Sequence, residues 1–206
     1  MTTLYIVRHG ETEWNTQKLL QGHTDSPLTE KGIEQAKESA AHFKTLTFDA
    51  AFSSDLLRAK RTAEFIALEH NLVVTTTNLM RERNFGKYEG RLVSEFRADL
   101  REMITDLSEA EKRNFKLTDD MESDEEVISR LLTFLRQTAL AYDGKNVLIV
   151  THSGVIRLLL TRFGYVTQDG LDGLSIKNLA YIKLDCDGSE FFIRDTHNII
   201  KQEYYK

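Results

Sequence analysis

Short runs of apolar, often β-branched residues alternate along the chain with longer stretches in which apolar residues recur every three or four positions. The short runs predict strands, and the longer stretches predict helices with one buried face. Because the two alternate, we expect a three-layer α/β sandwich, with a mostly parallel central sheet flanked by helices. The predicted strands cover residues 4–7, 50–52, 73–77, 147–150, 180–185 and 190–194.

Polar residues at the ends of these stretches mark turns and helix termini. Asp187 and Gly188 predict a hairpin turn between the last two strands. Ser123 and Glu126 match a capping box at the start of a helix that Gly144 ends. Asp55 is expected to cap another helix. The predicted helices cover residues 29–46, 54–70, 123–144 and 154–164.

One segment, residues 95–122, differs in character because it is polar and leads into an acidic run. No linker or repeat divides the chain, so we expect a single domain over residues 1–206 with this segment as a small, partly helical lid or insertion. A solvated helical face without ligand contact is the alternative. The basic residues of the segment are Arg97, Arg101, Arg113 and Lys116.

The composition limits the classes of function. The 206 residues are 41% hydrophobic, which suffices for one sizeable core. The net charge of −5 provides no basic field for nucleic acid, so any anion site must be local. A single cysteine, Cys186, rules out an internal disulfide and favours a reducing, cytoplasmic setting. We expect neither a signal peptide nor a membrane span, and the pattern does not distinguish a monomer from an oligomer.

Two predicted strands end in the same way, with a histidine that is closely followed by glycine. His9 precedes Gly10, and His152 is followed two positions later by Gly154. Side chains at the carboxyl ends of parallel strands face a common crevice, so the two imidazoles are expected to meet. Glycine lets the backbone turn sharply and approach a ligand closely.

Two arginines are expected at the same edge of the sheet as the histidines. Arg8 adjoins His9, and Arg58 lies in the first turn of a predicted helix. Two guanidinium groups and two imidazoles in one crevice would form an anion site suited to a phosphoryl group. Each histidine alone could instead be an ordinary structural residue. His23, in a predicted loop, could line the mouth of the site.

Five segments carry a family resemblance: "RHGETEWN", "QGHTDSPLTEKG", "SSDLLRAKRTAE", "RERNFGKYEG" and "THSG". Their content and order resemble the histidine phosphatase superfamily, the phosphoglycerate-mutase-like group. The resemblance implies phosphoryl transfer from a small phosphorylated substrate, without a metal or cofactor.

The same resemblance implies roles for individual residues. His9 would be the nucleophile that forms a phosphohistidine, and Glu82 would protonate the leaving oxygen. Arg8, Arg58 and His152 would neutralise charge during transfer. Contacts to phosphate or substrate are implied for Arg8, Asn15, Gln21, Gly22, Arg58 and His152.

Physical chemistry agrees with these roles. Nearby cations disfavour the imidazolium form of His9 and therefore keep it nucleophilic. Partial burial and a nearby phosphate dianion would raise the pKa of Glu82 and keep it protonated. The alternative for Glu82 is a salt bridge with Arg81 or Arg83, which would lower its pKa.

Several activities stay open at this point. We expect a metal-independent phosphoric monoester hydrolase of the histidine acid phosphatase type, because the chain is short for a glycolytic mutase. A bisphosphoglycerate-dependent phosphoglycerate mutase is the alternative. A non-catalytic phospho-ligand module and a metal-dependent hydrolase with His9 and His152 as ligands are less favoured, the latter because arginines make a poor cation site.

Overall fold

The computed structural model describes residues 1–167 and 174–201. A six-stranded sheet with the order β3-β2-β4-β1-β5-β6 runs through the molecule. The first four strands of that order are parallel, and β5 and β6 are antiparallel to their neighbours. The strands are β1 (Thr2–Arg8), β2 (Ala50–Ser54), β3 (Val74–Thr77), β4 (Asn146–Thr151), β5 (Leu174–Cys186) and β6 (Phe191–Lys201).

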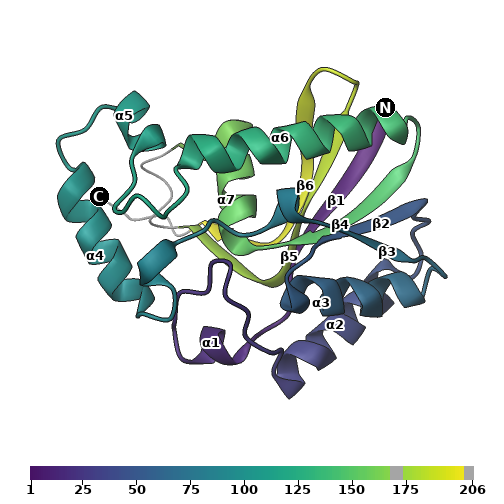
Figure 1. The fold of residues 1–206 in the computed structure, drawn as a ribbon. Coiled ribbons are helices and arrows are strands. Elements are labelled where there is room, and N and C mark those ends of the chain that lie inside the picture. Colours follow the sequence, from purple (N-terminus) through teal and green to yellow (C-terminus); the bar gives the residue numbers. More distant parts are fainter. Residues whose placement is uncertain (168–173, 202–206) are drawn as a thin grey trace.

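Helices cover both faces of the sheet, so the predicted three-layer α/β sandwich is confirmed. Figure 1 shows α6 and α7 on one face and α2 and α3 on the other. Alternate residues of β1 enter two cores: Leu4 and Ile6 pack on the α6–α7 side, and Tyr5 and Val7 on the α2–α3 side. These helices are α2 (Glu30–Phe43), α3 (Leu57–Leu68), α6 (Asp124–Ala141) and α7 (Ser153–Arg162).

The helix ends partly follow the predicted signals. Ser123 and Glu126 form the expected capping box of α6. The predicted cap at Asp55 is wrong, because α3 begins after Leu56 without a side-chain cap. Asp55 instead accepts two hydrogen bonds of 2.7 Å from the Arg81 guanidinium. The Asp55 carboxylate thus forms a bidentate ion pair with Arg81 and does not cap the helix.

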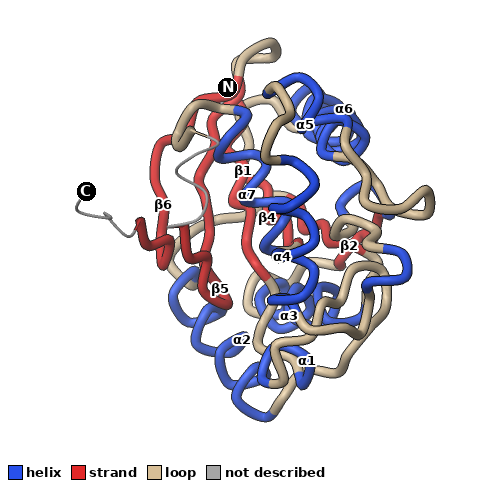
Figure 2. Tube along the Cα trace, turned by 90° about the vertical axis from the view of Figure 1, so that its left-hand side faces the viewer, coloured by secondary structure: helices blue, strands red, loops and turns tan. Residues whose placement is uncertain are grey.

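The polar segment 95–122 contains most of α4 (Val93–Ile104) and all of α5 (Glu109–Asn114). Leu20, Tyr88, Phe96 and Met121 form a small third core beneath it. Figure 2 shows α4 and α1 (Glu13–Thr16) on the side of the molecule that faces the viewer. Two short 3-10 helices, η1 (Asn78–Met80) and η2 (Gly86–Tyr88), lead into this region.

Across the described ranges 1–167 and 174–201, no helix is both long and apolar enough to cross a bilayer.

Candidate active site

The two histidines meet at the carboxyl edge of the sheet, as predicted. His9 follows β1, and His152 is the N-cap of α7 directly after β4. Because β1 and β4 are neighbouring parallel strands, the two ring centroids lie 5.2 Å apart with an interplanar angle of 62°. Both side chains are buried. The His9 N–H continues the strand pairing by donating to the Thr151 carbonyl at 3.0 Å.

A local hydrogen bond orients the His9 ring. Its Nδ1 lies 2.7 Å from the Gly10 carbonyl oxygen, which can only accept. The neutral imidazole therefore carries its proton on Nδ1 and its lone pair on Nε2. Burial, and then the positive charges of Arg58 and Arg8, hold the pKa of His9 well below its ordinary value. His9 is thus a neutral ring with one free nucleophilic nitrogen.

His152 is also neutral. Burial lowers its pKa well below the ordinary value, and the positive charges of Arg58, Arg130 and Arg8 act in the same direction. Neither ring nitrogen of His152 has a hydrogen-bond partner among the described residues. The ring can therefore donate one hydrogen bond to an oxygen placed beside His9.

Arg58 is almost fully buried and is held by a neighbouring loop. Its Nη1 donates to Asp25 Oδ1 at 2.9 Å and to the Thr24 carbonyl at 3.0 Å, and its Nη2 donates to the Gly22 carbonyl at 2.7 Å. These contacts fix the plane of the guanidinium group. They leave Nε without a partner in the described part of the chain.

Arg8 is held in a similar way on the other side of His9. Its Nη1 donates to the Ile176 carbonyl at 2.6 Å, while Nε has no partner within the described residues. Burial lowers the pKa of Arg8 to about 10, although the Glu82 charge opposes the shift. Arg8 therefore stays cationic at neutral pH.

Unpartnered polar atoms are concentrated at this site. Seven buried side-chain nitrogen and oxygen atoms in the described residues lack a hydrogen-bond partner, and five of them belong to Arg8, Gln21, Arg58 and His152. Buried polar groups are normally satisfied, so such a cluster indicates groups reserved for a ligand. Two guanidinium N–H donors beside two imidazoles match the oxygens of a phosphoryl group.

Glu82 reaches the same site from the loop between η1 and η2. Its side chain is buried, and Oε2 accepts from the Gly154 N–H at 2.9 Å while Oε1 accepts from the Arg83 N–H at 3.0 Å. A Cβ atom at Gly154 would overlap the Glu82 carboxyl. Gly154 thus provides the close approach that was predicted, although toward this carboxyl group and not toward a ligand.

The alternative salt bridges of Glu82 do not occur. Arg81 pairs with Asp55, and Arg83 pairs with Asp124 at the start of α6. The carboxyl group of Glu82 is therefore held by backbone N–H groups alone among the described residues.

The remaining predicted residues line the loop after His9. The Oδ1 of Asn15 accepts from the Thr12 N–H at 3.2 Å in the capping box of α1. Gln21 is buried, and its Nε2 donates to Thr12 Oγ1 at 2.8 Å. Gly22 has a φ of 57°, which favours glycine, and its carbonyl accepts from Arg58. These contacts are all to protein atoms, and of the buried side-chain atoms of these three residues only Gln21 Oε1 lacks a partner in the described part of the chain.

Two supporting residues were not predicted from the sequence. Asn178 lies in a bulged part of β5, and its Nδ2 donates to the His9 carbonyl at 3.0 Å. Glu89 accepts from the backbone N–H groups of His23 and Thr24, both at 2.8 Å, and so shapes the loop that holds Arg58. Glu89 lies in the quoted segment "RERNFGKYEG", so the family resemblance could have pointed to it. Asn178 could not be found in this way, because a bulge leaves no clear pattern in the sequence.

Several known proteins are similar to this chain. The model of the histidine phosphatase superfamily (branch 1) matches residues 4–199. The uncharacterized phosphatase PhoE of Bacillus subtilis is 37% identical over 161 residues, which cover 78% of this chain and 77% of PhoE. Phosphoglycerate mutase-like protein 4 of Arabidopsis thaliana is 34% identical, over 77% of this chain and 70% of its own.

A solved structure agrees with these relatives. A phosphoserine phosphatase mutant from Entamoeba histolytica, in complex with phosphoserine, superposes with a TM-score of 0.81 and 28% identity, over 95% of this chain and 96% of its own. The family model covers almost the whole chain, and the paired histidines lie within the matched residues. On this evidence, the chain belongs to the histidine phosphatase superfamily.

Proposed function

We propose that this member of the superfamily is a metal-independent phosphatase that hydrolyses a small phosphorylated metabolite through a phosphohistidine on His9. The observation that carries the proposal is the state of His9, a buried neutral ring whose Nδ1–H is bound to the Gly10 carbonyl. Its only free nitrogen, Nε2, has two cations and a second imidazole as neighbours. This is what an attack on phosphorus requires.

The reaction has two steps. In the first, His9 Nε2 forms a bond to phosphorus while the ester P–O bond breaks, and Glu82 gives its proton to the leaving oxygen. In the second, Glu82 takes a proton from water as the water oxygen attacks phosphorus and the P–Nε2 bond breaks. Phosphate leaves, and both side chains return to their initial states.

Charge stabilisation comes from groups that are already in place. Arg8 and Arg58 are fixed by hydrogen bonds to backbone carbonyls, so their orientation costs little during the reaction. His152 can donate to the same phosphoryl oxygens. Phosphoryl transfer depends chiefly on such positioning and neutralisation.

A phosphoglycerate mutase is the second candidate, because several relatives carry that name. A mutase would share the first step, but a hydroxyl group of the retained substrate would replace water in the second. The metal-dependent alternative has less support, since no group of three or more His, Cys, Asp or Glu in the described ranges could hold an ion. A phospho-ligand module without catalysis would bind but not turn over.

Phosphate release from a panel of phosphomonoesters, with EDTA present, tests the proposal. The panel holds p-nitrophenyl phosphate, sugar phosphates, phosphoserine and 3-phosphoglycerate, and His9→Ala is assayed alongside. We expect release that survives EDTA and is lost in His9→Ala. Conversion of 3- to 2-phosphoglycerate only when bisphosphoglycerate is added would favour the mutase. Loss of activity in EDTA, or no turnover at all, would contradict the proposal.

A further inference from the structure

The loop that carries Glu82 has no strand or helix to satisfy its backbone. Glu82 lies between η1 and η2, so the carbonyl groups of this loop need hydrogen-bond donors from elsewhere. Any freedom in this backbone would be passed on to the carboxyl group. The position of Glu82 therefore depends on what holds the loop.

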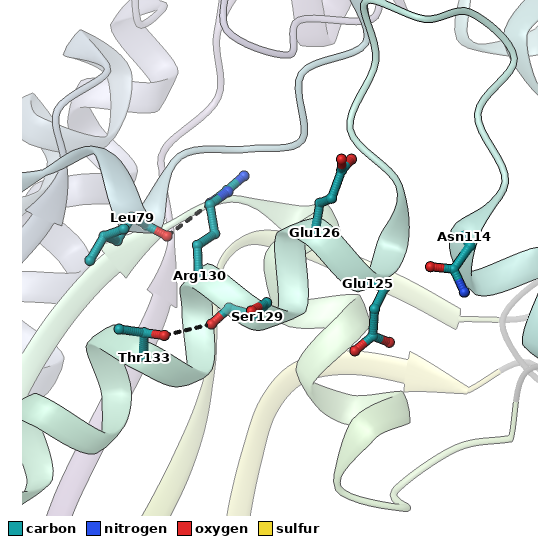
Figure 3. A pocket seen from close by; sticks show the side chains of 7 residues that line it. All are labelled: Leu79, Asn114, Glu125, Glu126, Ser129, Arg130 and Thr133. Carbon is teal, nitrogen blue, oxygen red and sulfur yellow. Dashed lines mark hydrogen bonds between the residues drawn. The ribbon is translucent and has the colours of Figure 1, made fainter.

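Arg130, on α6, supplies donors to this loop and to the end of η1 that leads into it. Its Nη1 donates to the carbonyl oxygens of Leu79 and Arg81, both at 2.8 Å, and its Nη2 donates to that of Glu82 at 3.0 Å. Figure 3 shows the Arg130 side chain reaching the Leu79 carbonyl at the edge of a surface hollow.

The two remaining donors of Arg130 bind Glu122. Nε donates to Glu122 Oε1 at 2.8 Å, and Nη2 donates to Oε2 at 2.9 Å. Burial alone would raise the pKa of Glu122, but its hydrogen bonds to Arg130 and Asn84 outweigh burial and lower it. All five guanidinium N–H groups of Arg130 are thus used within the protein. In this respect Arg130 differs from Arg8 and Arg58, each of which keeps Nε unpartnered in the described residues.

Glu122 and His23 also hold the loop that carries Glu82. Glu122 Oε2 accepts from the Asn84 N–H at 2.8 Å, and the Glu122 N–H donates to the Asn84 carbonyl at 3.0 Å. His23 Nε2 donates to the Glu82 carbonyl at 3.0 Å. The backbone before Glu82 is therefore held by Arg130 directly, and the backbone after it is held through Glu122.

We propose that Arg130 is a positioning residue that holds Glu82 at the distance and angle needed for proton transfer to the leaving oxygen. This inference rests on the proposed role of Glu82 as the proton donor. Displacement of a catalytic group by about 1 Å can cost on the order of 10²-fold in rate. All five N–H groups of Arg130 are used within the protein, so its removal should affect the step that depends on Glu82 more than the binding of phosphate.

The ratio of kcat/KM for two substrates tests the inference. p-Nitrophenyl phosphate has a leaving group that barely needs a proton, whereas an alkyl phosphate needs one. In Arg130→Met we expect kcat/KM to fall about 10²-fold for the alkyl phosphate and only a few-fold for the aryl phosphate. Both values come from one preparation, so the ratio is independent of how much protein is folded.

Control variants separate the possible outcomes. Arg136→Met changes an exposed arginine of the same helix and should leave the ratio unchanged. Arg130→Met in a Glu82→Gln background should add no further change to the ratio, because the proton donor is already gone. Arg130→Lys should shift the ratio in the same direction, because lysine has too few donors for the five oxygen atoms that Arg130 binds. This variant replaces Arg130→Met if the latter does not fold.

Two results would overturn the inference. One is an equal loss on both substrates in Arg130→Met and Arg130→Lys, and the other is the same shift in Arg136→Met. A failure of the proposed function would look different, because Glu82→Gln alone would then show no dependence on the leaving group.

Discussion

Gly154 is placed so that its backbone can reach a carboxyl group. Its N–H donates to Glu82 Oε2 at 2.9 Å, and the space that a Cβ atom would need is filled by the Glu82 carboxyl. Only glycine at this position leaves room for the Glu82 carboxyl group in the site. Arg130 fixes the backbone of Glu82, while Gly154 fixes its side chain.

Gly154→Ala should displace the Glu82 carboxyl because the added methyl group overlaps it. We expect kcat/KM for alkyl phosphates to fall about 10²-fold, with a much smaller loss for p-nitrophenyl phosphate. Steady-state kinetics on the two substrates measure this. Gly164→Ala is the matched control. Its φ of 73° should cost stability, but no atom of the described residues lies within 4 Å of the added Cβ, so the substrate ratio should stay constant. An unchanged ratio in Gly154→Ala would contradict the assignment.

Among the elements, α4 packs over a small core of its own, and α5 packs against α6. We propose that this segment, residues 95–122, acts as a lid that selects substrates. Its basic side chains include Arg101 and Arg113, which are exposed to solvent. Lys116 pairs with Glu126 at 2.7 Å.

Replacing Arg101, Arg113 or Lys116 with alanine should therefore raise KM for larger anionic substrates by about 10-fold and spare p-nitrophenyl phosphate, which is too small to need the lid. A substrate panel on each variant measures the effect, with Arg61→Ala on α3 as an exposed basic control. A uniform loss across all substrates would argue against a lid that selects.

Elements could be predicted where the signal is local. The buried strands at residues 4–7 and 147–150 are continuous apolar runs, and the capping box at Ser123 needs only neighbouring residues. Asp55 has the composition of a cap, but Arg81, 26 residues away along the chain, offered it a stronger bidentate partner. Strand β6 extends to Lys201, well beyond the predicted residues 190–194. Its more polar second half stays in the sheet because it pairs with β5.

The candidate site shows the same division. His9, Arg8, Arg58 and His152 were predictable because each stands at the end of a strand or the start of a helix. Arg130 was not, because it acts through backbone carbonyl groups that any sequence would provide. Such partners become visible only when the chain is folded.

At the scale of the whole molecule, the site concentrates positive charge within a protein of net charge −5. The two histidines remain neutral inside it, because burial and the arginines depress their pKa values below the ordinary 6.5. Folding therefore excludes two protons that the unfolded chain would bind in acid. This has a measurable consequence for stability.

The free energy of unfolding should fall as the pH drops below about 6.5. Below this pH the unfolded state binds protons at His9 and His152, whereas the folded state does not, so acid favours unfolding. The stabilisation that the two neutral histidines provide is therefore fully present only above about pH 6.5. Each histidine adds a slope of up to about 1.4 kcal/mol per pH unit. Denaturant titrations between pH 5 and 7 should show a shallower slope in His152→Gln than in the unmodified chain. An identical slope in both would contradict the depressed pKa.

In the proposed mechanism, the phosphoryl group passes through His9. Glu82→Gln offers a way to trap it, because p-nitrophenyl phosphate needs little help from an acid in the first step, while water attack in the second step loses its base. We would mix this variant with p-nitrophenyl phosphate, quench in base, and locate the phosphoryl group by peptide mass spectrometry. We expect one phosphoryl group on the peptide that contains His9, and none in the His9→Ala variant. A phosphoryl group on another residue, or phosphate release at the full rate by His9→Ala, would contradict it.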